Sequence, residues 1–283
     1  MRHPPSQTTL AAPNPELFDG LPSTPGVYRF FGARDELLYI GKSINIRQRV
    51  KGHFAARNRD RKEQRLCQQT VRISHTTTAA ELGALLLENR EIKRYQPIFN
   101  RRQRRHRQLF TWRLVHSEKH HLMPRLLRLA DLPQWPEDSY GLFRSPRQAQ
   151  QTLLSLVNNH RLCPQACGLE QGHGACFSYQ LKRCGGVCCG EESVTQHNQR
   201  VLNALQRMQI KAWPFEGAIW LHDHGETTCD YHLVHNWCHL TTSSTPVNGD
   251  RRDVTDASFD LDSYRLLVKA ISQGMAYTSA NCG

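Results

Sequence analysis

The sequence lacks any long apolar run. None of its stretches approaches the roughly 20 consecutive apolar residues that a membrane-spanning helix needs, and residues 1–20 contain no apolar core of the kind found in a secretory signal peptide. These absences argue against a membrane protein and a secreted one, and we expect a cytoplasmic chain. The length of 283 residues predicts two compact units, at roughly 150 residues each.

Acidic residues are scarce in the first part of the chain. Residues 1–110 contain 21 lysines and arginines against 9 aspartates and glutamates, an excess equal to the whole net charge of +12. Residues 111–283 contain 16 of each sign and are balanced. Concentrated positive charge is typical of a phosphate-binding surface, because neutralising phosphates releases counterions. The alternative is a solvated basic face, and we favour nucleic-acid binding over it.

Cysteine is concentrated in one short region. Six of the ten cysteines lie between Cys163 and Cys189, and the others are scattered. In a cytosolic protein such a cluster indicates a metal site rather than disulfides. Thiolates in a set of four suit either tetrahedral zinc or an iron–sulfur cluster, and the spacing does not distinguish the two. The role we expect is structural, because this loop-rich segment has few large apolar residues.

The first hundred residues contain several clear elements. "GVYRFF" and "ELLYIG" are β-branched and aromatic and flank the turn "GARD", which predicts a β-hairpin. Residues 43–54 have the period of a helix, with Ser43 as the expected N-cap. A second, basic helix is predicted at residues 60–69 and a third strand at residues 71–76.

The most regular element follows at residues 78–97. Thr78 and Glu81 have the spacing of a capping box, and Pro97 ends the helix. Glu88 lies on the flank of the apolar face, which is formed by Leu82, Leu85, Leu86 and Ile92. The five arginines within residues 101–107 predict a flexible segment along a phosphate backbone, with a solvated arm as the alternative.

The remainder of the chain is less regular. Strands and turns are expected in residues 108–145, and helices at residues 146–160 and 193–211 on either side of the cysteines. The fold class predicted is α+β, with a short, mostly antiparallel sheet flanked by helices in the first domain. The expected divisions are an N-terminal arm (1–19), a first domain (20–107), connecting strands with the cysteine-rich segment (108–210) and a C-terminal region of unknown role (211–283).

The predicted elements would bring several reactive side chains together. Tyr28 and Tyr39 lie on paired strands, Lys42 follows the second strand, and Arg49 comes two helical turns later. Glu88 is the carboxylate best placed to bind a metal ion. Hydrolysis of a phosphodiester needs an activated water, charge neutralisation and help for the departing oxyanion. A divalent cation on one carboxylate, with an arginine and a phenol or lysine, would supply all three.

The motifs that carry this pattern resemble a known family. "GVY", "YIGKS", "RQRVKGH" and "LLLENREIKRYQPIFN" are similar, in order and spacing, to the GIY-YIG nuclease domain of UvrC, a subunit of bacterial nucleotide excision repair. The likeness continues through "RLC" and "ACFSYQLKRCGGVCCG" into the cysteine-rich segment, so that it covers about residues 20–210. Because the chain shows no second nuclease domain, it most resembles the short, Cho-type UvrC homologues.

The resemblance implies a role for each matching residue. Tyr28 would be the base or the water-positioning phenol, Tyr39 and Lys42 would line the scissile phosphate, and Arg49 would stabilise the developing charge. A free phenol has a pKa of about 10, so Tyr28 would need help from the cation or Lys42 to accept a proton at neutral pH. Many relatives carry a second tyrosine where this chain has His53, which would either share the proton transfer or contact a phosphate.

The resemblance also implies cofactors and a DNA surface. Glu88 would bind Mg²⁺ or Mn²⁺, and Asn100 would support the site. A [4Fe-4S] cluster, which the resemblance favours, or Zn²⁺ would be held by Cys163, Cys176, Cys184 and Cys188. The basic residues expected at the DNA are Arg47, Lys51, Arg101, Arg102, Arg104, Arg105 and Arg107.

Overall, the resemblance implies one metal-dependent incision on the 3′ side of a lesion in double-stranded DNA. UvrA and UvrB would already have marked that DNA. The chain would be monomeric outside the repair complex. Two alternatives stay open: a stand-alone GIY-YIG nuclease of the homing or restriction type, and a non-catalytic nucleic-acid adaptor that uses the metal cluster only to bind. A further acidic group, Asp253, Asp256, Asp260 and Asp262, is interpreted as a solvated loop.

Overall fold

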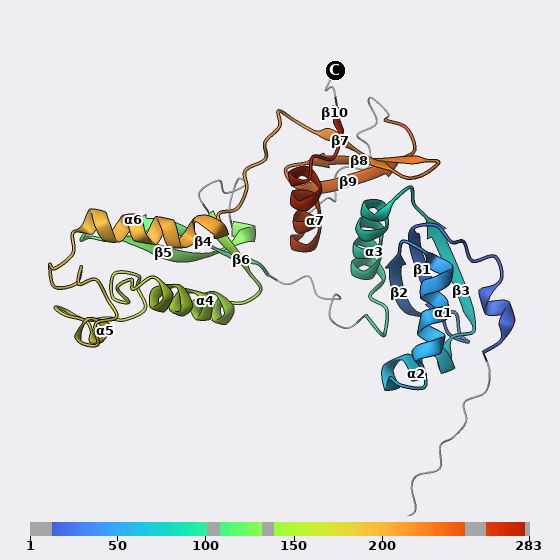
Figure 1. The fold of residues 1–283 in the computed structure, drawn as a ribbon, viewed down its shortest axis with the longest axis horizontal. Coiled ribbons are helices and arrows are strands. Elements are labelled where there is room, and N and C mark those ends of the chain that lie inside the picture. Colours follow the sequence, from blue (N-terminus) through green and yellow to red (C-terminus); the bar gives the residue numbers. More distant parts are fainter. Residues whose placement is uncertain (1–12, 101–107, 132–138, 247–258, 281–283) are drawn as a thin grey trace, which may run out of the picture. The chain divides into compact units, whose positions relative to one another are not determined.

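The computed structural model describes residues 13–100, 108–131, 139–246 and 259–280 (Figure 1). The chain forms two compact units: Met1–His106 together with Phe215–Gly283, and Arg107–Pro214. Helices and mainly antiparallel sheets occur in both, which confirms the predicted α+β class. Among the described helices, none is long and apolar enough to cross a bilayer.

A three-stranded antiparallel sheet forms the centre of the first unit, with β1 between β2 and β3. Helices α1 and α2 lie between β2 and β3 along the chain, α3 follows β3, and a short 3₁₀ helix, Pro15–Phe18, precedes β1. The predicted hairpin, helices and third strand are therefore all present. Their bounds are β1 Gly26–Phe31, β2 Leu37–Ser43, α1 Ile46–Ala56, α2 Arg61–Gln69, β3 Arg72–Thr77 and α3 Glu81–Tyr95.

Two of the predicted helix starts are wrong. The N-cap of α1 is Asn45, whose side chain accepts a hydrogen bond from the Gln48 N–H, whereas Ser43 ends β2. The N-cap of α3 is Ala80, and Thr78 donates its hydroxyl to the Ala80 carbonyl instead of forming a capping box with Glu81. Strand β2 continues to Ser43, and the turn after β3 continues to Ala80. Each N-cap therefore lies two residues further along the chain than predicted.

Apolar residues from the sheet and from two helices form the core beside the predicted site. The α1 residues Ile46, Val50 and Phe54 are buried at the four-residue steps expected of one helix face. They pack with Tyr28, and the same cluster includes Leu21, Phe30, Leu38 and Leu66. This packing fixes α1 against β1 and places the polar residues between the buried positions beside the sheet.

The C-terminal part of the first unit is a four-stranded antiparallel sheet and a helix, which the weak sequence pattern did not predict. The strand order is β10-β7-β8-β9. Helix α3 contacts β7 and α7 of this part (Figure 1). The bounds are β7 Ile219–His224, β8 Cys229–His235, β9 Cys238–Ser243, α7 Leu261–Ser272 and β10 Tyr277–Ser279.

The interpretation of the acidic group as a solvated loop is wrong for Asp260. This residue is the N-cap of α7, accepting a hydrogen bond from the Ser263 N–H, and it forms an ion pair with Lys93 of α3. A capping carboxylate satisfies backbone N–H groups that a helix leaves unpaired at its start. Asp253 and Asp256 lie outside the described residues.

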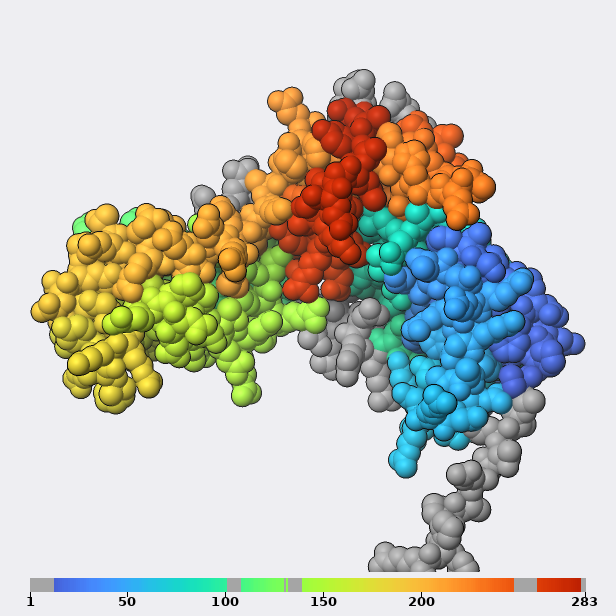
Figure 2. Space-filling model, viewed as in Figure 1, coloured from blue at the N-terminus to red at the C-terminus, as the bar shows by residue number. Residues whose placement is uncertain are grey.

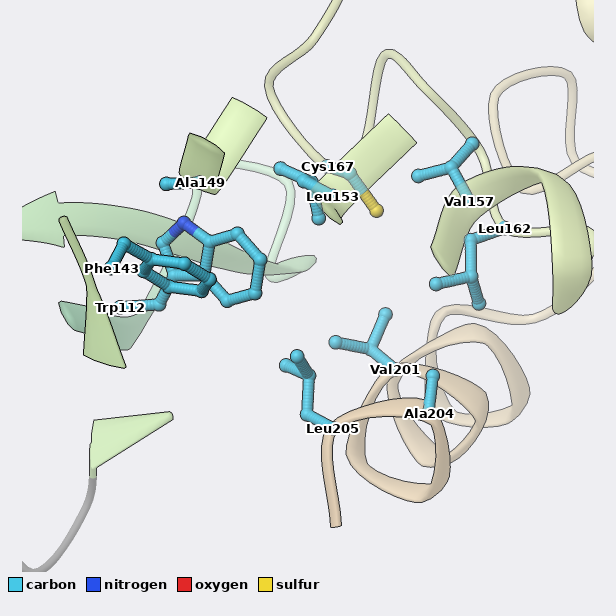
Figure 3. Packing of buried hydrophobic residues seen from close by; sticks show 10 residues of the cluster. All are labelled: Trp112, Phe143, Ala149, Leu153, Val157, Leu162, Cys167, Val201, Ala204 and Leu205. Atoms are coloured by element: carbon cyan, nitrogen blue, oxygen red, sulfur yellow. The ribbon is translucent and has the colours of Figure 1, made fainter. Parts of the chain in front are cut away.

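The second unit packs helices on a sheet of order β5-β4-β6. Its core joins Trp112 of β4 to Phe143 of β6, with ring centroids 4.3 Å apart, and adds residues from α4 and α6 (Figure 3). The helix predicted at residues 193–211 is present but shorter, ending at Leu205. The bounds are β4 Phe110–His116, β5 Leu122–Arg128, 3₁₀ Leu129–Asp131, β6 Ser139–Phe143, α4 Pro146–Asn159, α5 Phe177–Gln180, α6 Val194–Leu205 and 3₁₀ Gln206–Met208.

Candidate active site

The two predicted tyrosines meet across the β1–β2 ladder. Tyr28 pairs with Gly41, and its ring centroid lies 6.1 Å from that of Tyr39. A Cβ on residue 41 would lie 2.3 Å from the Tyr28 hydroxyl oxygen, so only glycine leaves room for the phenol there. Gly41, two residues after Tyr39, is thus required by the position of the Tyr28 ring.

Helix α1 brings a histidine to the buried phenol. His53 is 5% exposed, and its Nε2 lies 2.7 Å from Tyr28 Oη. Arg49, one turn earlier, lies beside the same phenol and is exposed to solvent. His53 therefore faces Tyr28 and the protein interior, while Arg49 is accessible to a substrate.

Glu63 completes this group, and sequence reasoning missed it. Its Oε2 lies 2.6 Å from His53 Nδ1. The residue lies in the first turn of α2, which begins at the N-cap Asp60. The available signal was that Glu63 is the one acidic residue within Arg61–Gln69, but nothing in the spacing pairs it with α1.

The ionisation of these groups assigns the direction of each hydrogen bond. Burial, assisted by Tyr39, raises the pKa of Tyr28 far above neutral pH, although Arg49 opposes the shift. The hydrogen bond from His53 holds the pKa of Glu63 below its ordinary value. A neutral phenol donates a hydrogen bond and a carboxylate accepts one. His53 therefore accepts a hydrogen bond from Tyr28 Oη at Nε2 and donates one from Nδ1 to Glu63.

Glu88 lies on α3 and contacts the end of β2. Its Oε1 accepts a hydrogen bond of 3.0 Å from the Lys42 backbone N–H. Burial raises the pKa of Glu88, while the Lys42 amide, the Lys42 charge and Arg49 lower it. A partly buried carboxylate that binds protons more tightly than usual gains when a cation replaces the proton.

The other predicted site residues have separate contacts. The Lys42 side chain forms an ion pair with Glu81. Asn100 is buried and bonds both backbone groups of Ile40, accepting from its N–H at 2.9 Å and donating to its carbonyl at 2.8 Å. These two bonds hold β2 next to Gly41, so the structure places Asn100 behind the site.

The predicted DNA-contacting residues are described only in part. Arg47 is exposed, but its Nε donates to the Leu21 carbonyl at 2.7 Å. Lys51 is exposed. The five arginines of residues 101–107 lie outside the described residues.

Together these contacts supply the parts that phosphodiester hydrolysis needs. A carboxylate suited to a hard cation, an exposed guanidinium and a phenol hydrogen-bonded to a histidine converge at the ends of β1 and β2. Oxygen ligands of this kind are the ones that Mg²⁺ prefers.

Comparison with known proteins places the chain in a family. Family models match a UvrC-like GIY-YIG domain over residues 24–101, the UvrC/Cho excinuclease middle domain over 110–207 and the excinuclease Cho C-terminal domain over 218–281. Excinuclease cho of Escherichia coli K12 and that of Shigella flexneri are each 39% identical over 262 residues, covering 91% of this chain and 86% of the relative. The chain belongs to the Cho-type excinuclease family.

As a Cho-type excinuclease, the protein is a DNA repair endonuclease that hydrolyses phosphodiester bonds. The expected resemblance to UvrC-related nucleases is confirmed by these matches. The chain is also similar to a crystal structure of the GIY-YIG N-terminal endonuclease domain of UvrC from Thermotoga maritima bound to its catalytic magnesium. That likeness has 26% identity and a TM-score of 0.28, and it covers 30% of this chain and 92% of that one.

The cysteine segment of this Cho-type excinuclease forms a compact sulfur cluster. The Sγ atoms of Cys163, Cys176, Cys184 and Cys188 all lie within 4.8 Å of one another. Backbone N–H groups point at two of these sulfurs, from Cys176 to Cys188 Sγ at 3.4 Å and from Gly186 to Cys184 Sγ at 3.3 Å. N–H donors of this kind stabilise thiolates and are common around metal-bound sulfur.

The other two cysteines of the segment lie elsewhere. Cys167 is buried in the apolar core of the second unit beside Leu153, and burial raises the pKa of its thiol to about 12 (Figure 3). Cys189 is exposed, and its thiol donates to the Gly186 carbonyl. The structure therefore separates an inert core thiol and a surface thiol from the four clustered ones.

Proposed function

We propose that this Cho-type excinuclease makes a single incision on the 3′ side of a lesion, in DNA that UvrA and UvrB have already marked. The supporting observation is that Glu88, Arg49 and Tyr28 converge where β1 pairs with β2, in a chain of the excinuclease family. The sequence shows no recognisable base-reading motif, which favours recognition of the lesion by partners. The cytoplasmic location and the monomeric state remain predictions.

Glu88 is the proposed ligand of the catalytic Mg²⁺ or Mn²⁺. The fit rests on a partly buried carboxylate with one oxygen held by the Lys42 amide. The bound cation would neutralise phosphate charge and acidify water. Arg49, exposed beside Tyr28, is placed to pair with the charge that develops on the phosphate, and a guanidinium offers two parallel donors for this purpose.

Tyr28, His53 and Glu63 form the proposed proton path. Tyr28 Oη takes the proton of the attacking water while its own proton passes to His53 Nε2, 2.7 Å away. The imidazolium that results is stabilised by Glu63, 2.6 Å from Nδ1. His53 thereby removes the difficulty that a buried phenol with a raised pKa is a poor base by itself. This assigns His53 to proton transfer rather than to phosphate contact.

Glu63→Gln tests the proton path. Glutamine can still accept from Nδ1–H but has no charge to stabilise the imidazolium, so we expect the nicking rate to fall about 10- to 100-fold at neutral pH. The Mg²⁺ concentration for half-maximal nicking should stay the same, because Glu63 does not touch Glu88. Glu36→Gln, at an exposed residue of the β1–β2 turn, is the control. An unchanged rate in Glu63→Gln would remove Glu63 from the mechanism.

A nicking assay tests the proposed function as a whole. A duplex with one defined lesion is incubated with the protein and Mg²⁺, with and without UvrA and UvrB, and Glu88→Ala is compared with the exposed control Glu226→Ala. We expect one nick 3′ of the lesion that requires both partners and disappears only in Glu88→Ala. Nicks at specific sites in undamaged DNA would instead indicate a stand-alone nuclease, and no nicks anywhere would indicate an adaptor.

The four clustered cysteines are proposed to hold a structural metal centre. Zinc and a [4Fe-4S] cluster are the candidates. A single zinc ion with bonds of about 2.3 Å holds its sulfurs about 3.8 Å apart, which suits sulfurs that lie within 4.8 Å of one another. A [4Fe-4S] cluster would require them to spread, because four irons stand between them. Absorption near 400 nm after anaerobic purification, with metal analysis, distinguishes the two.

A further inference from the structure

Helix α3, which carries Glu88, begins without a cap of its own. Its N-cap is Ala80, and in the described chain no side chain at that position accepts a hydrogen bond. The first N–H groups of a helix have no partner within the helix and must find one elsewhere. Thr78, which could have served, uses its hydroxyl as a donor to the Ala80 carbonyl.

Two aspartates from the C-terminal sheet accept hydrogen bonds at this end of α3, one from the first turn of the helix and one from the residue just before its N-cap. Asp223 Oδ2 accepts from the Gly83 N–H and Asp230 Oδ2 accepts from the Ala79 N–H, each at 2.7 Å. Asp223 is 4% exposed, so its carboxylate is committed to this contact. Negative charge at a helix N-terminus is also favoured by the helix dipole. A segment about 140 residues further along the chain therefore does the work of the local cap.

The contact is close and supported from behind. A Cβ on Gly225 would lie 2.0 Å from the Ala79 carbonyl oxygen, so glycine is needed where the β7–β8 turn meets the start of α3. Buried His232 lies with Nε2 3.5 Å from Asp223 Oδ2 and with Nδ1 2.9 Å from the Thr242 hydroxyl. Three strands of the C-terminal sheet thus contribute to holding one carboxylate in place.

A second contact holds α3 on the far side of Glu88. Asp260 pairs with Lys93 and accepts from the Asn89 side-chain amide, which also donates to Ser263 Oγ at 2.9 Å. Asn89 is the neighbour of Glu88 in the chain. The C-terminal segment therefore contacts α3 both before and after Glu88. In Figure 2 the visible part of α3 (teal) lies next to residues of this segment (orange and red).

We propose that the C-terminal segment (residues 215–280) positions the metal-binding helix of the nuclease, with Asp223, Asp230 and Asp260 as positioning residues for Glu88. This inference rests on the proposed role of Glu88 and gives the C-terminal domain a task in the same site. A carboxylate that binds one cation next to a fixed arginine must be placed to within a fraction of an ångström. Loss of the groups that orient a metal ligand typically costs about 10- to 100-fold in metal affinity.

The test compares two graded series in the full-length protein. Asp223→Ala and Asp230→Ala remove the acceptors, Asp223→Asn and Asp230→Asn retain an oxygen acceptor without charge, and Glu226→Gln changes an exposed acid of the β7–β8 turn as the control. One readout is the Mg²⁺ dependence of nicking. The other is hydrogen exchange of the α3 amides, which does not depend on activity.

We expect the Mg²⁺ concentration for half-maximal nicking to rise about 10-fold in the alanine variants, with the rate largely restored at saturating Mg²⁺. Exchange at the first turn of α3 should accelerate, and the asparagine variants should recover most of both losses. Unchanged Mg²⁺ dependence, or a rate loss that is the same at every Mg²⁺ concentration, would overturn the proposal. If one alanine variant fails to fold, the other decides by the same two criteria.

Glu88→Ala, run in parallel, separates this proposal from the proposed function. If Glu88→Ala nicks as well as the unmodified protein, the proposed role of Glu88 fails and the positioning argument fails with it. If Glu88→Ala abolishes nicking while the aspartate variants retain normal Mg²⁺ dependence and normal exchange, the positioning argument alone is wrong.

Discussion

At the scale of single residues, Gly41 has the sharpest steric requirement. Gly41→Ala would place a methyl group 2.3 Å from the Tyr28 hydroxyl and 2.8 Å from the Tyr39 ring. Because one of these phenols must move, we expect nicking to fall about 100-fold. Gly52→Ala in α1 is the matched control: none of the described atoms lies within 4 Å of its Cβ, and alanine in a helix adds about 0.5 to 1 kcal/mol of stability. Normal nicking by Gly41→Ala would contradict the arrangement of the phenols.

Glu88 illustrates the conflict between stability and function. Burial raises the pKa of Glu88 in the folded protein above its value in the unfolded chain. The free energy of unfolding therefore falls as the pH rises from the ordinary glutamate pKa through the raised one. Glu88→Gln keeps an acceptor for the Lys42 amide and removes this cost. Without divalent cation at pH 7, we therefore expect its Tm to exceed that of the unmodified protein by a few degrees, while nicking is lost.

The same reasoning fixes the pH dependence of this effect. Below the ordinary glutamate pKa of about 4.3, Glu88 is protonated in both the folded and the unfolded chain, so the difference in Tm should vanish there. Thermal melts of both proteins in chelator across this pH range provide the measurement. A Glu88→Gln variant that is less stable at pH 7 would show that the carboxylate is not destabilising.

At the scale of elements, strand β2 depends on a residue far along the chain. Asn100 bonds both the N–H and the carbonyl of Ile40. Asn100→Ala leaves these buried groups without partners, and we expect a loss of about 1 to 3 kcal/mol in the free energy of unfolding. Asn100→Asp should lose at least as much, because its buried carboxylate cannot donate to the Ile40 carbonyl and carries an unpaired charge. Denaturant titration measures both, and equal stability of all three proteins would contradict this role.

The elements of the nuclease domain could be predicted because their signals are local. The hairpin turn, the apolar period of α1 and the proline after α3 each act within a few residues, and the corresponding elements are present. The predicted start of α3 failed because a distant partner decides the outcome there. Thr78 and Glu81 have capping spacing, but Asp223 supplies the acceptor in the first turn of α3 and Glu81 pairs with Lys42 instead. Glu63 escaped prediction for the same reason, since its pairing with His53 joins two helices.

At the scale of the whole molecule, the sequence pattern divides the chain differently from its contacts. The C-terminal region was expected as a separate segment of unknown role, whereas Phe215–Gly283 belongs to the same compact unit as the nuclease sheet. Its strands are short and mix polar with apolar residues, so periodicity is weak, and its attachment to α3 relies on aspartates that look solvated in the sequence. The cysteine cluster was recognisable because residue type alone identifies it.

The second unit has a weak region that a metal centre would hold together. Between α4 and α6 the described chain contains a single short helix, Phe177–Gln180, and its small apolar cluster consists largely of the cysteines themselves. Burial raises the pKa of Cys184 to about 11, so without a cation its thiol stays protonated and is a poor electrostatic partner.

We expect metal removal, or Cys184→Ser, to expose the amides of residues 163–192 to rapid exchange. The nuclease unit has its own core, so its amides should stay protected from exchange. Cys167→Ser is the control, and it should accelerate exchange only in the apolar core around residue 167. Hydrogen exchange followed by mass spectrometry resolves these regions, and protection of residues 163–192 that survives complete metal loss would show that the segment folds without a metal.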